Sequence, residues 1–311
     1  MNNIYKCITC SMFLSGFLYS LGVCYPWPVN PFNEQHGING TLGECRDNRD
    51  HFHKGVDVEG SSGTNVYPVV DGIVTYVSTT GINAYVEVTD NANNVFKYQH
   101  IDPIVKKNDA VTASVTILGT IKNIANPHLH FEDGLGSRNP LRNGALTPFV
   151  DNTNPVINSV DIYKQGTNEQ FQSALYGKID LWVNAYDPRT TSNGGNAGGN
   201  CGIYKIIIKF LSCNQPIGDS IVYHIYNSVA AAPITDVFTE GSTSTNFIYN
   251  ATNDPFHTPY DKYWNSKQQR GEPYNVDAII PSQAMYNEGH MQIRIIVEDI
   301  QGNSDTLDIG H

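Results

Sequence analysis

The sequence is poor in charged residues, and basic residues are the scarcer kind. Only 16% of the 311 residues are charged, and 19 Lys and Arg stand against 30 Asp and Glu, giving a formal net charge of -11. Affinity for nucleic acid comes mainly from Lys and Arg, so this composition predicts no nucleic-acid partner. The same acidity disfavours non-specific binding to anionic polymers, and we expect any partner to be recognised in a pocket.

Long apolar runs are also lacking. The mostly apolar run from Ile8 to Val23 is too short, and too often interrupted by polar residues, to predict a membrane span. We interpret residues 1–24 as a secretory signal peptide, which predicts export to the periplasm, cell envelope or extracellular space, with no integral membrane span after processing. A buried N-terminal helix is the alternative. The sequence Leu-Gly-Val-Cys at 21–24 leaves open a lipid anchor on Cys24.

Cysteine is scarce, and two of the six residues, Cys7 and Cys10, would leave with the signal peptide. Between Cys201 and Cys213, apolar and polar residues alternate, which predicts one continuous strand. Twelve steps at about 3.3 Å cover about 40 Å, whereas a disulfide needs Cα atoms within about 7 Å. A continuous strand therefore excludes a disulfide between them. Cys45 is expected to be a buried, chemically silent thiol.

No stretch shows a sustained helical period. Short runs rich in β-branched and aromatic residues follow one another between Gly, Asn, Asp and Pro clusters, which predicts antiparallel β-structure. The first half should hold strands at 66–70, 72–78, 84–89, 95–100, 115–121 and 128–132. The second half should hold strands at 156–163, 178–186, 203–211, 220–226 and 291–299. The Gly-rich stretch 190–200 is expected to be a loop.

A polar, turn-rich linker near residues 151–155 marks a domain boundary. The strands that follow it have the length and alternation of an immunoglobulin-like β-sandwich. The predicted organisation is a signal peptide at 1–24, an extended leader at 25–50, a β-domain at 51–150 and an immunoglobulin-like β-sandwich domain at 151–311.

Two histidine motifs carry the chemistry of the first half. In Pro127-His128-Leu129-His130-Phe131-Glu132 the two imidazoles are two residues apart in a predicted strand, so both project from the same face. Upstream, His53 and Asp57 form a His-x-x-x-Asp pair. One imidazole of the strand with this pair gives three protein ligands, the number that a catalytic zinc needs when its fourth position stays open. The remaining histidine and His100, which ends another predicted strand, are candidates for proton transfer.

These motifs in this order resemble the lysostaphin-type zinc endopeptidases of bacterial cell walls. The resemblance runs from about Gly40 to about Leu141. It includes a Gly-Thr-x-Val-Tyr segment leading into Asp-Gly-x-Val at 63–74, the closing motif at 127–132 and Asn-Pro-Leu at 139–141. The resemblance implies an antiparallel β-sheet or sandwich of the duplicated hybrid motif type, into whose groove the ligands project.

The resemblance assigns His53, Asp57 and His130 as ligands of Zn²⁺, and His100 and His128 as the catalytic pair. It implies a secreted metalloendopeptidase that hydrolyses the stem or cross-link peptides of peptidoglycan with zinc-activated water. The alternatives are a non-catalytic protein that binds the wall or activates another hydrolase, and the same chemistry on secreted proteins.

Three residues near the first ligand leave their roles open. His51 is interpreted as a flanking loop histidine, with a part in the site as the alternative. Glu44 and Arg46 either orient groups around the ligands or substrate, or pair with each other on the surface, which is the interpretation that we favour.

Overall fold

The computed structural model describes residues 24–164, 167–170, 179–212, 215–216, 221–224, 234–251 and 291–310. This described part is almost entirely antiparallel β-structure, and its one helix is the four-residue α1, Ile234–Val237. The predicted mainly β fold is confirmed. The residues described include no helix long and apolar enough to span a membrane. Apart from Cys24, the predicted signal peptide lies outside the described residues.

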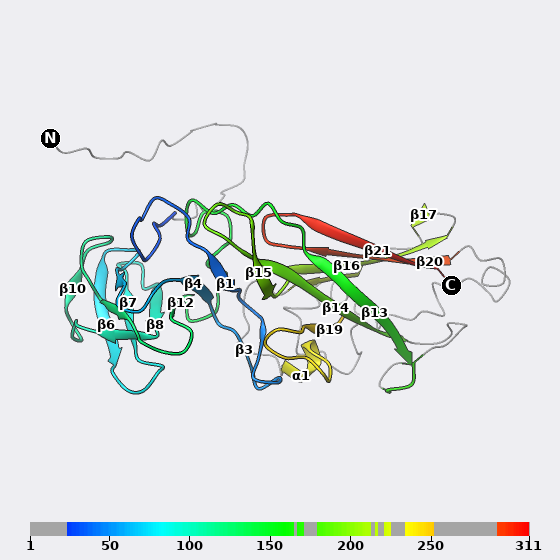
Figure 1. Ribbon diagram of the computed structural model, residues 1–311, viewed down its shortest axis with the longest axis horizontal. Helices are drawn as coiled ribbons and strands as arrows, with labels where there is room; N and C mark the ends of the chain where they lie inside the picture. The colour runs from blue at the N-terminus through cyan, green and yellow to red at the C-terminus, as the bar shows by residue number, and fades with distance from the viewer. Residues whose placement is uncertain are drawn as a thin grey trace.

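The first half contains twelve strands in the described residues. They are β1 (Ile38–Gly40), β2 (Cys45–Arg46), β3 (His51–Phe52), β4 (Val56–Glu59), β5 (Asn65–Val66), β6 (Gly72–Ser78), β7 (Tyr85–Thr89), β8 (Val95–Gln99), β9 (Ile101–Pro103), β10 (Ala110–Val111), β11 (Gly119–Ile121) and β12 (His128–Asp133). Figure 1 shows an elongated molecule with β6, β7, β8 and β10 at one end and β1 and β3 near its middle. The order β10-β6-β7-β8-β12-β4-β1 makes a continuous sheet, and β5-β11-β9 makes a second one.

The second half continues that sheet and adds another. Its strands are β13 (Val156–Lys164), β14 (Ile179–Thr190), β15 (Asn196–Cys201), β16 (Lys205–Ser212), β17 (Gln215–Pro216), β18 (Ile221–His224), β19 (Ile248–Asn250), β20 (Met291–Glu298) and β21 (Ser304–Gly310). β14 pairs with β1, β13, β15 and β19, and a five-stranded sheet is built on the order β17-β16-β20-β21, with β18 beside β16. The immunoglobulin-like topology and the domain boundaries stay predictions.

Two hydrophobic cores lie under these sheets. The first contains buried side chains of residues 25–146, among them Trp27, Tyr98 and Phe131, and the second contains buried side chains of residues 42–52 and 162–297. β7 and β8 alternate between buried and half-buried positions, as expected for strands that show one face to a core.

The segment 25–50, expected as an extended leader, is packed into both cores. Tyr25, Trp27 and Val29 belong to the first core, whereas Leu42 and Cys45 belong to the second. Its strand β1 lies between β4 and β14 in the large sheet. The leader therefore holds the two halves together.

Several predicted strands are shorter than the sequence indicated. The run 115–121 yields only β11, because residues 112–116 form a turn in which Val115 and Thr116 both donate to the carbonyl of Thr112. The run 66–70 yields only β5, which stops before Pro68, a residue without an N–H for a strand ladder.

The predicted loop at 190–200 is wrong in part, because it contains most of β15. Pro188 of β14 pairs with Asn200, and Thr190 pairs with Asn196. Backbone groups suffice for a ladder when a neighbouring strand supplies the template. The strand predicted at 203–211 is present as β16, but it begins at Lys205 and is not continuous with Cys201, where β15 ends. Cys201 is a buried free thiol, and Cys213 lies outside the described residues.

Trp27 tests whether the leader stabilises the fold. Its side chain is fully buried, and its Nε1 donates to the carbonyl of Pro148 at 2.7 Å. Trp27→Ala should lower the free energy of unfolding by about 3–5 kcal/mol, because it leaves a large cavity. Urea denaturation measures the change. Val115→Ala, at a side chain that is 69% exposed, should change the stability by less than about 0.5 kcal/mol; equal effects of the two variants would contradict the packing.

Candidate metal centre

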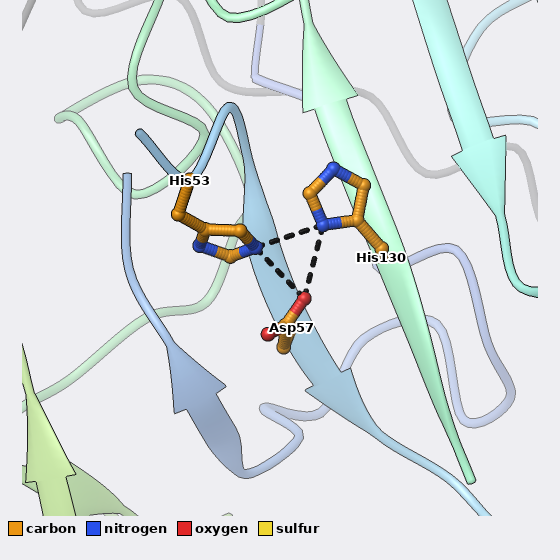
Figure 2. A group of neighbouring side chains, drawn as sticks. All are labelled: His53, Asp57 and His130. Carbon is orange, nitrogen blue, oxygen red and sulfur yellow. Dashed lines mark hydrogen bonds and ion pairs between the residues drawn. The ribbon is translucent and has the colours of Figure 1, made fainter. Parts of the chain in front are cut away.

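Three buried side chains converge beside the pairing of β4 with β12. His53 follows β3, Asp57 lies in β4 and His130 lies in β12 directly opposite Asp57. The neighbours of these two strand residues point into the first core, so Asp57 and His130 point to the other face of the sheet. Figure 2 shows the three side chains directed at one another.

The converging atoms are close enough to hold one ion. His53 Nε2 lies 2.9 Å from Asp57 Oδ1 and 2.8 Å from His130 Nδ1, and His130 Nδ1 lies 3.0 Å from Asp57 Oδ1. Their residues are only 5–7% exposed. Ligands at about 2.0–2.1 Å from a tetrahedral zinc stand about 3.3 Å apart. The set of two imidazole nitrogens and one carboxylate oxygen therefore fits a metal ion with little movement.

The hydrogen bonds behind the two imidazoles fix which nitrogen faces the centre. His53 Nδ1 lies 2.7 Å from the carbonyl oxygen of Thr41, which can only accept, so this nitrogen carries the hydrogen. His130 Nε2 in the same way donates to Glu132 Oε1 at 3.1 Å. The neutral rings therefore present lone pairs on His53 Nε2 and His130 Nδ1, as metal ligands must.

The electrostatics of the centre favour positive charge. Burial lowers the pKa of His53 and so keeps it neutral. Burial also acts to lower the pKa of His130, but hydrogen bonds to Asp57 and Glu132 outweigh it and the pKa is raised. Burial opposes ionisation of Asp57, yet His53 and His130 hold its pKa well below the usual range. The negative potential that raises the pKa of His130 also favours a divalent cation at the point where the three ligand atoms meet.

Arg46 and Glu44 lie behind Asp57, and the favoured interpretation of a surface pair is wrong. Glu44 is only 1% exposed. Arg46 Nη2 donates to Asp57 Oδ2 at 2.8 Å and to Glu44 Oε2 at 3.0 Å. A Cβ at Gly40 would lie 2.5 Å from Arg46 Nη2, so glycine is required for this close approach. Arg46 thus fixes the second oxygen of Asp57 and leaves Oδ1 for the centre.

His100 and His128 form a second pair next to the centre. Their ring centroids are 4.7 Å apart, and the centroid of His100 is 6.0 Å from that of His130. His100 Nδ1 donates to the carbonyl of Ile82 at 2.9 Å and His128 Nδ1 to that of Asn126 at 2.7 Å. His128 Nε2 faces the centre, 3.6 Å from Asp57 Oδ1. Burial lowers the pKa of His100 to about 4, and it is neutral at pH 7.

Two other predicted residues lie away from the centre. His51 is exposed, and its Nδ1 lies 3.0 Å from Asp50 Oδ2. Cys45 is buried in the second core, where burial raises the pKa of its thiol. Within the described ranges, no fourth His, Cys, Asp or Glu completes the metal-ligating group, which leaves a position open.

Sequence reasoning missed Glu132 and Thr41 as groups that orient the histidines. Glu132 had a signal, because in His-x-His-x-Glu the carboxylate shares a strand face with both imidazoles. Its Oε1 also accepts from Lys97 Nζ at 3.0 Å. Burial acts to raise the pKa of Glu132, but His130 and Lys97 lower it, so it stays ionised. Thr41 acts through a backbone carbonyl, for which a sequence carries no signal.

The chain shares this region with a known family. The sequence model of Peptidase family M23 matches residues 51–139, which confirms the resemblance to the lysostaphin-type peptidases. No curated protein matches the chain.

Solved structures similar to parts of the chain include two peptidases and a third protein, Csd3. They are a zinc-containing peptidase from Vibrio cholerae (25% identity, TM-score 0.32, covering 37% of this chain and 38% of that one), the catalytic domain of the antimicrobial peptidase lysostaphin from Staphylococcus simulans (25%, 0.28, 31% and 77%) and Csd3 from Helicobacter pylori (28%, 0.31, 39% and 33%). The match spans less than two fifths of the Vibrio cholerae peptidase.

Glu132→Gln tests the orientation of His130. The amide keeps the shape but loses the charge that holds the hydrogen on His130 Nε2, so the affinity for zinc should fall roughly 10–100-fold. Competition with a chromophoric chelator measures it. Glu59→Gln, at an exposed carboxylate of the adjacent strand β4, should leave the affinity unchanged. Equal affinities in wild type and Glu132→Gln would show that Glu132 does not orient the ring.

Proposed function

We propose that the chain is a zinc metalloendopeptidase that hydrolyses peptide cross-links of bacterial peptidoglycan. The observation that carries the proposal is the convergence of His53 Nε2, Asp57 Oδ1 and His130 Nδ1 within 3.0 Å of one another, beside a second histidine pair, in a segment that belongs to a peptidase family. Three protein ligands with one open position are characteristic of a catalytic rather than a structural zinc.

The ligands in this proposal are His53, Asp57 and His130. A zinc ion held there supplies a Lewis acid that polarises a peptide carbonyl and makes water acidic enough to lose a proton near pH 7. Thr41, Glu132 and the Arg46 guanidinium hold the ligands in the required tautomers and orientation, so little reorganisation is needed on binding.

His100 and His128 are the catalytic residues of the proposal. Each is tethered by its Nδ1 to a backbone carbonyl, and His128 Nε2 lies 3.6 Å from Asp57 Oδ1. One of them accepts the proton of the attacking water at its Nε2 and passes that proton to the leaving amine, and the other, when it carries a hydrogen on Nε2, donates a hydrogen bond to the developing oxyanion. His128 keeps a side chain that is 19% exposed, which leaves it accessible to a substrate.

Peptidoglycan is the substrate class proposed from the resemblance to the lysostaphin-type enzymes. A cell-wall substrate requires export, in agreement with the signal peptide expected at residues 1–24, and action in the periplasm, cell envelope or extracellular space. The acidic surface supports recognition of peptide stems in the groove over non-specific adhesion to anionic wall polymers.

Variants of two histidines distinguish a zinc ligand from a catalytic residue. His130→Ala should lose both zinc and activity, because it removes a ligand. His128→Ala should keep about one zinc per chain and lose about 10²–10⁴-fold in activity. Metal analysis and release of soluble fragments from purified peptidoglycan measure the two properties, on protein that begins after Cys24. His51→Ala, at the exposed neighbouring histidine, should behave as wild type.

Three results would contradict the proposal. Wild type that binds zinc and cleaves neither peptidoglycan nor protein would favour a wall-binding or hydrolase-activating role. Cleavage of casein without release of peptidoglycan would favour the same chemistry on secreted proteins. Wild type without zinc would remove the basis of the proposed chemistry.

A further inference from the structure

A second group of buried carboxylates lies where the two halves of the chain meet. Asp151 precedes β13, Asp187 lies in β14 and Asp299 follows β20. They are only 3–7% exposed, and one oxygen atom of each lies within 4.8 Å of those of the others. The three side chains line a cavity of about 20 Å³, which is room for one water-sized particle.

Asp187 is the member that lacks a partner. Its Oδ1 is buried without any hydrogen bond, although the residue is only 6% exposed and lines the cavity. The other two carboxylates are held in place: Thr190 Oγ1 donates to Asp151 Oδ2 at 2.7 Å, and the backbone N–H of Asn303 donates to Asp299 Oδ1 at 2.8 Å. A buried carboxylate oxygen without a donor is unfavourable in a protein interior, and a cation in the cavity would supply the missing partner.

The charges around Asp187 all have the same sign. Burial, and then the charges of Asp151, Asp299 and Glu44, raise the pKa of Asp187 well above its usual value. Among the ion pairs of the described residues, none joins a Lys, Arg or His to Asp151, Asp187 or Asp299. The cavity therefore carries uncompensated negative potential.

We propose that Asp151, Asp187 and Asp299 bind one calcium ion. Carboxylate oxygens are the ligands of hard cations, and the group contains no sulfur or imidazole that would select zinc. Oxygens bound to one Ca²⁺ at about 2.3–2.6 Å are at most about 5 Å apart, and the three carboxylate oxygens lie within 4.8 Å of one another.

The ion would join segments that are distant in the sequence. Asn303 Nδ2 already donates to the carbonyl of Asp151 at 2.9 Å, linking the β20–β21 turn to the end of the first half. The cavity is also lined by Leu42 of the leader and by Asn139, which follows β12. Calcium at this place fixes the second half against the peptidase segment.

Calcium titration tests the site directly. Full-length processed protein is treated with chelator, reloaded with one equivalent of zinc and titrated with CaCl₂ by calorimetry. We expect one Ca²⁺ per chain with a Kd of about 10⁻⁵–10⁻³ M. Calcium at about 100 times Kd should raise Tm by about 5 °C. Terbium, excited through tyrosine because Tyr204 lines the same cavity, should luminesce and be displaced by calcium.

Asp187→Asn is the decisive variant, because the amide is isosteric and relieves the repulsion. It should fold with a Tm in calcium-free buffer at least equal to that of wild type, and should lose both the calcium shift and the terbium signal. Asp47→Asn, at an exposed aspartate in a left-handed turn that Asn also tolerates, should respond to calcium as wild type. The response should persist in His130→Ala, which separates this site from the proposed zinc site.

Two results would overturn the proposal. Wild type without a calcium shift or terbium signal would show that the carboxylates share protons instead. An unchanged calcium response in Asp187→Asn would place the ion elsewhere.

Discussion

The antiparallel pairing of β4 with β12 is the constraint on which the candidate centre depends. It sets His130 directly opposite Asp57. A shift of one residue in the register would send either side chain into the core. The valines, Leu129 and Phe131 on the other face are fully buried, so the hydrophobic core and not the polar residues fixes that register. The site is therefore held by the same burial that stabilises the sheet.

Around this pairing, buried charges alternate in sign. Arg46 lies between Glu44 and Asp57, and Glu132 lies between Lys97 and His130. In an interior of low dielectric constant each charge needs a partner in contact. The alternation gives each charge a partner. It also fixes the tautomer of His130 and leaves Asp57 Oδ1 free to face the centre. Glu44 is the last residue of the series Asp57, Arg46 and Glu44. Its negative charge also raises the pKa of Asp187, which lies where the two halves meet.

The junction is thus part of the same electrostatic system. The leader contributes to both cores, β1 joins β4 to β14, and Glu44 accepts from the backbone N–H of Gly202 at 3.0 Å. The orientation of Arg46, and through it of Asp57, depends on packing against the second half. The second half consequently supports the segment that carries the candidate centre.

The sequence by itself determined the mainly β fold and the residues that form the candidate centre. Alternation and turn residues are local properties, and His53, Asp57, His100, His128 and His130 stand in motifs with the spacing of known ligands and catalysts. For Glu44 and Arg46 the sequence left two alternatives open, and it did not indicate the strand β15 or the carboxylates at the junction. Their roles come from contacts such as Glu44 with Gly202, 158 residues apart, and burial and partners at such distances are decided only by the tertiary structure.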